Sequence, residues 1–391
     1  MDRPRNFRVY FASAIVAVGA LIVLMREHRP SFLRPDLHLC AYATTADGTV
    51  AVVDLVKLKT VTLIPVGPGL SGMREHPTRP EILGVSSPGG YVWVLDARSY
   101  QVSARIPVGP LPYALDFSTD GDRVYTTTSG NDAVLAIDIR SRAIVAHGRT
   151  GREPVLAKAT PDGKSVLVVN RGDSSLGIHD AAALTPRSSV PVVPQPDAVA
   201  VLPDSSVAFV MSRAEPRLSV VDLRRGVLMT NLELAGKPTD MLLKPDGGEL
   251  YVISPEAHGL QVINTWTHEV GDTMVLGSAP TRGVLSADAN LLYVSDTAAD
   301  RVTPVDIINR RIIREALLEK HPEKGFPIPA GDAPGALRFD PNETLLLVVN
   351  QGSGDLAVIR VRTNFLVTVI PVGQRPEGLA VKLYGNKEPV R

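Results

Sequence analysis

Short apolar runs that end in a polar residue recur along the chain at a fixed interval. The runs end at Asp54, Asp96, Asp138, Asp180, Asp222, Asn264, Asp306 and Arg360. Six successive intervals are 42 residues long, and the seventh is 54, which is 42 plus a 12-residue insertion. A repeat at one fixed period predicts a repeat architecture and overrides any estimate of domain number from length.

Each repeat contains four short segments with the composition of β-strands. In one unit they are residues 112–117, 124–128, 133–138 and 143–148, and Thr119-Asp120-Gly121 is typical of a tight hairpin turn between the first two. A proline begins the first segment of each later unit, and Leu70 takes the corresponding place in the first interval. These prolines are Pro112, Pro154, Pro196, Pro238, Pro280, Pro334 and Pro376. The pattern shows no helical period of 3.6 residues, so each unit is expected to be a four-stranded antiparallel sheet.

Stacked sheets of this kind bury both of their faces when they close into a ring. We therefore predict an all-β propeller of eight four-stranded blades, with seven blades as the alternative. The chain enters in the middle of a blade, because residues 39–44 match a second strand and residues 377–383 match a first strand. The last strand should complete the blade that the N-terminus begins, which removes a free sheet edge.

Composition narrows the possible partners and chemistry. Lys plus Arg and Asp plus Glu each number 41, so the chain lacks the basic excess expected of a nucleic-acid-binding protein, and such binding is the least favoured hypothesis. Cys40 is the single cysteine and cannot form an internal disulfide; we expect it to be a small buried residue at the start of a strand.

The N-terminal region contains 17 uncharged residues, 9–25, which as a helix would extend about 25 Å, near the lower limit for crossing a bilayer. No small-residue cleavage pattern follows them, so an uncleaved signal anchor is favoured over a secreted protein with a cleaved signal peptide. The predicted segments are a tail (1–8), the anchor (9–25), a linker (26–37), the propeller (38–384) and a C-terminal tail (385–391). The basic flank Arg3, Arg5 and Arg8 predicts a single-pass protein of the bacterial inner membrane with the propeller on the periplasmic or extracellular side.

Several motifs resemble those of the YVTN β-propeller repeat family. They are the Val-Asn pairs 169–170 and 349–350, the Ile-Pro-Val-Gly segments 64–67, 106–109 and 370–373, and the turns that contain Pro-Asp-Gly. The resemblance covers about residues 38–384 and implies the propeller fold. Relatives of this kind include lactonase-like propellers and eight-bladed d-type haem domains, so the resemblance implies two enzymatic or cofactor-binding alternatives. WD-repeat proteins are excluded, because neither Trp93 nor Trp266 precedes an aspartate.

Candidate chemistry is sparse. The aspartates that end the apolar runs are expected to cap turn N–H groups and not to bind metal. No nucleophile elbow, phosphate loop, dinucleotide fingerprint or paired-histidine zinc motif is present, so we predict no cofactor, no metal site and no catalytic residues. The favoured function is a binding or interaction scaffold.

The second–third turns and the blade-to-blade connections of such a ring share one face, and propellers commonly bind there. The insertion, residues 315–331, is expected on the same face. We expect an unknown protein or small-molecule ligand at this mouth. The candidate binding residues there are Arg152, Glu153, Arg171, Asp173, Arg213, Glu215, His258, His321 and Arg375.

Overall fold

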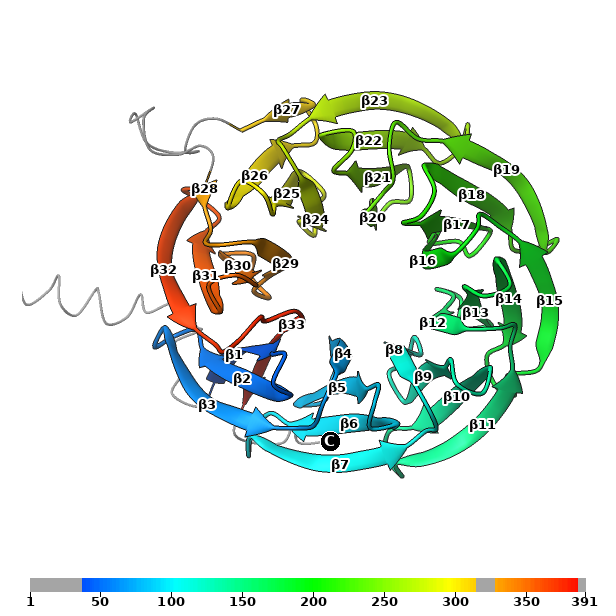
Figure 1. Ribbon diagram of the computed structural model, residues 1–391, viewed down its shortest axis with the longest axis horizontal. Helices are drawn as coiled ribbons and strands as arrows, with labels where there is room; N and C mark the ends of the chain where they lie inside the picture. The colour runs from blue at the N-terminus through cyan, green and yellow to red at the C-terminus, as the bar shows by residue number, and fades with distance from the viewer. Residues whose placement is uncertain (1–36, 314–327, 386–391) are drawn as a thin grey trace, which may run out of the picture. The chain divides into compact units, whose positions relative to one another are not determined.

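Eight antiparallel sheets arranged around a common centre form the unit from Leu39 to Leu383 in the computed structural model (Figure 1). The structure describes residues 37–313 and 328–385. The predicted eight-bladed propeller is confirmed. Within the described residues no helix is long and apolar enough to cross a membrane, and the predicted anchor 9–25 lies outside them.

The first four blades each contain four strands, ordered from the centre of the ring outward. Blade 1 contains β33 (Leu379–Gly385), β1 (Leu37–Thr44), β2 (Thr49–Asp54) and β3 (Lys59–Pro65). Blade 2 contains β4 (Leu70–Glu75), β5 (Glu81–Ser86), β6 (Tyr91–Asp96) and β7 (Gln101–Pro107). Blade 3 contains β8 (Pro112–Phe117), β9 (Arg123–Thr128), β10 (Ala133–Asp138) and β11 (Ala143–Arg149). Blade 4 contains β12 (Pro154–Ala159), β13 (Ser165–Asn170), β14 (Ser175–Asp180) and β15 (Pro186–Pro191).

The other four blades follow in chain order. Blade 5 contains β16 (Pro196–Val201), β17 (Val207–Ser212), β18 (Arg217–Asp222) and β19 (Val227–Glu233). Blade 6 contains β20 (Asp240–Leu243), β21 (Glu249–Ser254), β22 (Gly259–Asn264) and β23 (Glu269–Val275). Blade 7 contains β24 (Pro280–Leu285), β25 (Leu291–Asp296), β26 (Arg301–Asp306), β27 (Arg311–Ile312) and β28 (Ile328–Pro329). Blade 8 contains β29 (Pro334–Phe339), β30 (Leu345–Asn350), β31 (Asp355–Arg360) and β32 (Phe365–Pro371).

The core lies between neighbouring blades. Second and third strands such as β9 and β10 are buried almost throughout, which explains their continuous apolar sequences, whereas the outer strand β7 alternates between exposed and partly buried residues. One apolar cluster joins Leu83 and Val94 of blade 2 to Leu115 and Leu135 of blade 3. Each blade is therefore stabilised chiefly by its neighbours.

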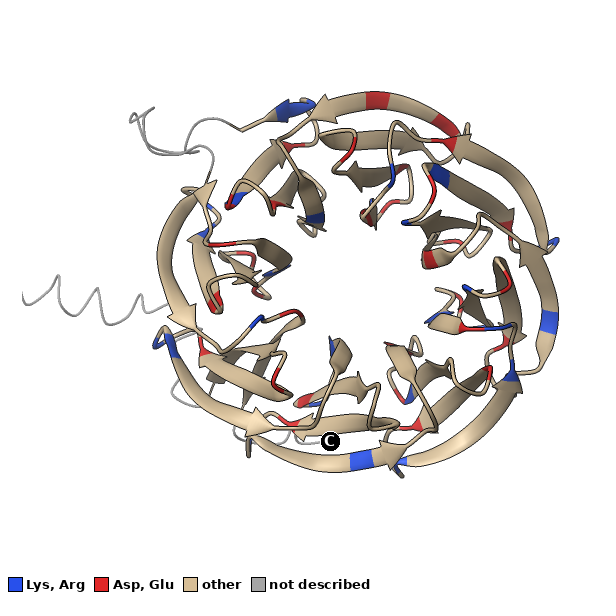
Figure 2. Cartoon of the chain, viewed as in Figure 1, with Lys and Arg blue, Asp and Glu red and all other residues tan. Residues whose placement is uncertain are grey.

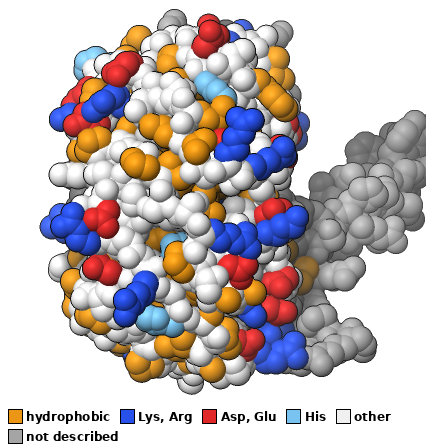
Figure 3. All heavy atoms as spheres, turned by 90° about the vertical axis from the view of Figure 1, so that its right-hand side faces the viewer, with side chains coloured by type: hydrophobic (Ala, Val, Ile, Leu, Met, Phe, Trp, Pro, Cys, Tyr) orange, Lys and Arg blue, Asp and Glu red, His pale blue; other side chains and the backbone are white. Residues whose placement is uncertain are grey.

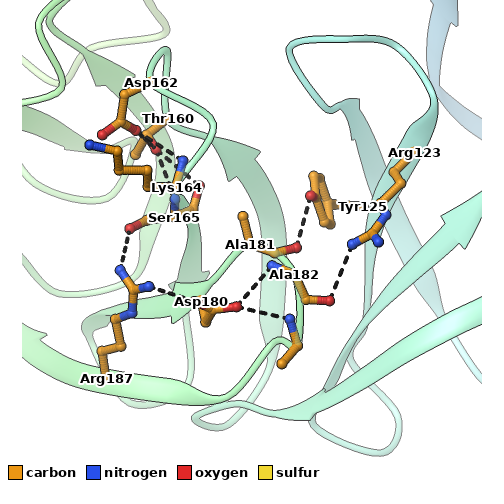
Figure 4. A network of polar contacts seen from close by, with 11 residues as sticks. Arg123, Tyr125, Thr160, Asp162, Lys164, Ser165, Asp180, Ala181, Ala182 and Arg187 are labelled. Carbon is orange, nitrogen blue, oxygen red and sulfur yellow. Dashed lines mark hydrogen bonds and ion pairs between the residues drawn. The ribbon is translucent and has the colours of Figure 1, made fainter.

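The third–fourth turns confirm the predicted capping role of the aspartates that end the apolar runs. Oδ1 of Asp180 accepts hydrogen bonds from the N–H groups of Ala182 and Ala183, both at 2.9 Å (Figure 4). Arg187 pairs with the same carboxylate at 2.5 Å. The Tyr125 hydroxyl of blade 3 donates to the Ala181 carbonyl at 3.0 Å, which joins this turn to the preceding blade. These carboxylates are occupied by turn structure.

The ring closes as predicted. Strand β33 pairs with β1, so the end of the chain completes the blade that its beginning opens. Leu379 and Val381 of β33 share a buried cluster with Ala41 of β1 and Leu347 of β30, which joins blade 1 to blade 8. Cys40 is 1% exposed within β1, as expected.

The insertion interrupts the outer strand of blade 7, which corrects its expected place among the loops of one face. Strands β27 and β28, on either side of it, both pair with β26. Pro304 lies on β26 between the residues that pair with β27 and those that pair with β28. Its carbonyl accepts a hydrogen bond from the N–H of Ile313, but a proline has no N–H of its own to donate. The missing donor removes a hydrogen bond to the outer strand where the chain departs. Residues 315–327 of the insertion, with His321, lie outside the described residues.

The ring has two faces of different construction. We call the face with the second–third turns and the blade-to-blade connections the junction face, and the face with the first–second and third–fourth turns the hairpin face. Charges of both signs are distributed around the ring (Figure 2). Basic, acidic and apolar side chains also intermingle on the outer side formed by β15 and its neighbours (Figure 3). No charge of one sign dominates these views, consistent with equal numbers of acidic and basic residues.

Candidate functional site

The predicted residues within the described part of the chain lie on the junction face. Arg171 and Asp173 belong to the turn between β13 and β14, and Arg213 lies in the corresponding turn of blade 5. Arg152 and Glu153 lie in the connection from blade 3 to blade 4. Because a four-stranded meander returns to the same end after every second strand, these loops share one face although they come from different repeats.

Arg152 and Asp173 form one part of the site. Nε of Arg152 lies 2.5 Å from Oδ1 of Asp173, and the backbone N–H of Arg152 donates to Oδ2 at 2.6 Å. These hydrogen bonds lower the pKa of Asp173. Both residues are exposed, so the pair orders the loops but contributes little to the free energy of unfolding.

Arg171 connects three blades. Its guanidinium pairs with Asp197 of β16, lies 3.8 Å from Glu153, and is placed 5.4 Å from the ring centre of Tyr113 in β8. Asp197 also accepts the backbone N–H of Arg213 at 2.9 Å. A guanidinium held by two carboxylates and an aromatic face has little freedom to move.

Next to this network, Asp240 and Arg282 occupy the inner strands of blades 6 and 7. Oδ2 of Asp240 accepts the N–H of Gly283 at 3.0 Å, and Oδ1 accepts the N–H of Met241 at 2.9 Å. Burial raises the pKa of Asp240, although the nearby guanidinium groups of Arg282 and Arg213 and both hydrogen bonds favour its charged form. Arg282 donates to the Thr239 carbonyl at 3.2 Å.

Sequence reasoning missed Asp197, Asp240 and Arg282. Asp240 and Arg282 occupy the second position after the recurring proline, where the other blades have small or apolar residues. Those residues are Gly72, Ala114, Leu156, Ala198, Ala336 and Gly378. A comparison of the repeats position by position would have singled out both charged residues. We call Arg171, Asp197, Arg213, Asp240 and Arg282 the inner arc.

The remaining predicted residues do not join the inner arc. Glu215 pairs locally with Arg217 at 3.1 Å. Nδ1 of His258 lies 2.9 Å from the Ser278 carbonyl, and its side chain is exposed. Arg375 is exposed in the connection before β33. Within residues 37–313 and 328–385, no three His, Cys, Asp or Glu side chains are grouped to hold a metal ion.

Comparison with models of known protein families identifies the family of the chain. A model described as YNCE-like beta-propeller matches residues 90–291. The chain belongs to the YNCE-like β-propeller family. This membership supports the resemblance to YVTN-type propellers. No curated protein matches the sequence.

Solved structures show the same fold at low sequence identity. The dihydro-haem d1 dehydrogenase NirN in complex with DHE is 18% identical, with a TM-score of 0.72 over 90% of this chain and 77% of that one. Hydrazine synthase of Kuenenia stuttgartiensis is 19% identical, with a TM-score of 0.58 over 76% of this chain and 96% of that one. A functionally unknown protein from Desulfotomaculum acetoxidans DSM 771 is 14% identical, with a TM-score of 0.59 over 76% and 98%. In all, 1671 chains of solved structures match. The likeness therefore establishes the fold, and the function has to be inferred from the site.

In this YNCE-like propeller, the side chains of the inner arc are of the kind that binds a ligand. Within the described residues, the guanidinium groups of Arg213 and Arg282 form no ion pair with a carboxylate. Guanidinium groups bind carboxylates and phosphates through paired hydrogen bonds. The inner arc is therefore suited to an anionic group on a ligand.

The hairpin face also contains a pocket, which the sequence did not predict. It has a volume of 590 Å³ and lies between blades 6 and 7, lined by residues that include Lys244, Asp246, Asp288 and Arg310. Lys244 pairs with Asp246 at 3.1 Å, and Arg310 pairs with Glu249. Because these charges are already compensated, the pocket is a weaker candidate than the inner arc.

Proposed function

We propose that the chain is a membrane-anchored binding propeller that holds an anionic ligand or partner segment on its junction face. The observation that carries this proposal is the pair Arg213 and Arg282 beside the half-buried Asp240. Neither guanidinium group forms an ion pair with a carboxylate of the described chain, and Arg282 stands where blades other than 6 and 7 have a small or apolar residue. Such groups are poorly explained by folding alone.

The neighbouring contacts support recognition over catalysis. Arg171 is fixed by Asp197 and Tyr113, and Asp197 in turn fixes the backbone of Arg213. The inner arc is thus ordered before a ligand arrives, which lowers the entropic cost of binding. It offers charge and hydrogen bonds and includes no serine, cysteine or histidine that could act as a nucleophile. The ligand class that fits best carries two carboxylates or a carboxylate and a hydrogen-bond acceptor.

Attachment through residues 9–25 is part of this proposal and is supported by the sequence of that segment. Strand β1 begins and β33 ends at the hairpin face, because Leu39 hydrogen-bonds with Leu55 beside the third–fourth turn of blade 1. A ring attached at that face would leave the junction face open to ligands.

Calorimetric titration with a panel of mono-, di- and tricarboxylates at low ionic strength tests the proposed function. Arg213→Ala and Arg282→Ala should each weaken binding of the best dicarboxylate by about tenfold or more, the size of a lost charged contact in a binding site. The matched control is Arg140→Ala, because Arg140 is exposed on the hairpin face. Binding that survives the double variant, or that Arg140→Ala weakens equally, would place the site elsewhere.

A second candidate function is the binding of a tetrapyrrole. It is favoured by the likeness of 90% of the chain to NirN in complex with DHE, together with the two guanidinium groups, which could pair with tetrapyrrole carboxylates. Absorption spectra of the purified protein, before and after addition of haem, test it. A Soret band that shifts on binding in the parent protein, but not in the Arg213→Ala/Arg282→Ala variant, would support this candidate over the first.

A further inference from the structure

The middle residues of the third–fourth turns, which we call the turn tips, have an unusual composition. They are the second and third residues after the end of each third strand. They are Val56-Lys57, Arg98-Ser99, Arg140-Ser141, Ala182-Ala183, Arg224-Arg225, Trp266-Thr267, Ile308-Asn309 and Arg362-Thr363. None of the sixteen is acidic, although the chain contains as many acidic as basic residues. The carboxylates of these turns lie at their first position, where they accept N–H groups.

The large apolar residues among these tips lie on three of four consecutive blades. Trp266 of blade 6 is 78% exposed, Ile308 of blade 7 is 69% exposed and Val56 of blade 1 is 52% exposed. Blade 8, which lies between blades 7 and 1, presents the exposed Arg362. Lys57 adjoins Val56, and its exposed side chain pairs with Asp54 of the same turn at 3.0 Å. We call the third–fourth turn tips of blades 6, 7, 8 and 1 the tip arc. It combines exposed apolar and basic side chains along one side of the hairpin face, over four of the eight blades.

The chain also enters the ring on this side. Strand β1 belongs to blade 1 and starts at the hairpin face. The predicted linker 26–37 has 12 residues, which span at most about 40 Å when fully extended. If residues 9–25 lie in a bilayer, the start of β1 in blade 1 is held within that distance of it.

We propose that the tip arc lies against an anionic membrane surface. Trp is favoured at the boundary between headgroups and acyl chains, and Lys and Arg are attracted to anionic headgroups. The apolar residues are single and stand on separate turns, so they form no continuous patch of the kind that binds a protein partner. A fluid lipid surface can accept each tip separately.

The arrangement of the other turns fits an edge-on contact. The first–second turns, which carry Asp246 and Asp288, connect inner strands, whereas the third–fourth turns connect outer strands. A ring tilted onto the tip arc places Trp266, Ile308 and Val56 at the bilayer while those carboxylates lie farther from the anionic surface. This contact goes beyond the proposed anchor, because it defines which edge of the propeller faces the lipid.

The two tryptophans provide an internal reporter for the test. Trp93 is fully buried, whereas Trp266 is the exposed one, so any lipid-dependent change of fluorescence should come from Trp266. The full chain would be reconstituted into vesicles of phosphatidylcholine with about one-third phosphatidylglycerol as the anionic lipid. Emission should shift to shorter wavelength, doxyl-labelled lipid should quench it, and acrylamide should quench it less. Trp266→Phe should abolish all three effects.

Charge variants separate the tip arc from the anchor. Lys57→Glu with Arg362→Glu should reduce doxyl quenching by about half or more, whereas Arg140→Glu with Arg224→Glu, on blades 3 and 5, should leave it unchanged. If the protein sediments with vesicles while Trp266 remains fully accessible to acrylamide, the anchor alone makes the attachment and the proposal is wrong. Failure of the full chain to bind these vesicles would also overturn it. None of these readouts depends on the carboxylate ligand, so the proposed binding function can fail separately.

Discussion

The last residue of each third–fourth turn shapes the turn, and in several blades its side chain also contacts the neighbouring blade. The last turn residue has a left-handed backbone in all eight blades, with φ between 51° and 67° at positions 58, 100, 142, 184, 226, 268, 310 and 364. Its side chain reaches the second strand of the preceding blade in several cases. Arg142 pairs with Glu81, and Arg310 pairs with Glu249 four repeats later. The backbone strain of a non-glycine residue, about 1 kcal/mol, is offset by these contacts between blades.

His76 should make the ring sensitive to acid. Its Nδ1 accepts the N–H groups of Thr78 and Arg79 at 3.2 and 3.0 Å, which only an unprotonated nitrogen can do. Burial lowers the pKa of His76 to about 4, and the charges of Arg79 and Lys382 act in the same direction. Since the folded pKa lies below the unfolded value of about 6.5, the stabilisation is present above pH 6.5 and is lost as the pH falls toward 4.

We expect the free energy of unfolding to fall by about 2 kcal/mol between about pH 7 and about pH 4.5, measured by urea unfolding. His76→Asn keeps an acceptor for the two N–H groups but cannot titrate, so it should lose much of this dependence. His147→Asn, in the exposed part of β11, is the matched control. A parent protein equally stable at both pH values would show that His76 is not held neutral.

Arg171 should matter for stability as well as for binding. It is half-buried and contacts Asp197, Glu153 and Tyr113, so Arg171→Ala leaves Asp197 without its guanidinium partner. We expect a loss of about 1–2 kcal/mol in the free energy of unfolding. Arg213→Ala, at an exposed position, should cost less than about 0.5 kcal/mol. Equal urea midpoints for the two variants would contradict this distinction.

At the scale of elements, the strands followed from the sequence because one pattern was repeated eight times. Asp138 and its counterparts marked strand ends, and residues 39–44 and 377–383 showed that the ring closes between its two ends. Comparing the repeats could have singled out Asp240 and Arg282, but not how their strands meet. Asp240 and Arg282 come together through the packing of neighbouring inner strands, where the N–H of Gly283 meets the Asp240 carboxylate. That contact depends on how blades 6 and 7 pack, which the order of residues does not reveal.

The outer strand of blade 7 shows a similar limit. The 12-residue excess located the insertion in the right repeat, but its length alone did not show which strand it interrupts. In the seven other blades the third and fourth strands shift register at the position equivalent to Pro304. A proline at a bulge is tolerated because pairing is already irregular there. Pro304 was therefore the available signal for the site of the insertion.

Closure by β33 should be essential for the ring. Deletion of residues 376–391 would expose the edge of β1 and remove Leu379 and Val381 from a buried cluster shared by blades 1 and 8. We expect a drop of about 10 °C or more in melting temperature, or aggregation. Deletion of 386–391 alone leaves β33 intact and is the control. A truncated chain that melts with the parent protein would exclude closure by β33 in solution.

At the scale of the whole molecule, the two proposals assign different roles to the two faces. The junction face holds the inner arc, and the hairpin face holds the ends of β1 and β33 together with the tip arc. If the hairpin face is directed toward the membrane, a ligand would approach the opposite side of the ring from the bulk solvent. This separation of attachment from recognition is possible on either side of the membrane, and the basic flank before residue 9 predicts the side outside the cytoplasm.

Cysteine labelling in spheroplasts tests that orientation. The parent chain provides a clean background, because Cys40 is its only cysteine and is 1% exposed. Lys237→Cys places a thiol at an exposed position on the junction face, and Asp2→Cys places one before the predicted anchor. A membrane-impermeant maleimide should label Lys237→Cys in intact spheroplasts and Asp2→Cys only after lysis, because the three arginines near the N-terminus favour the cytoplasmic side. Labelling of Asp2→Cys in intact spheroplasts and of Lys237→Cys only after lysis would show the opposite orientation. If the mature protein lacks residue 2, a cleaved signal peptide replaces the anchor.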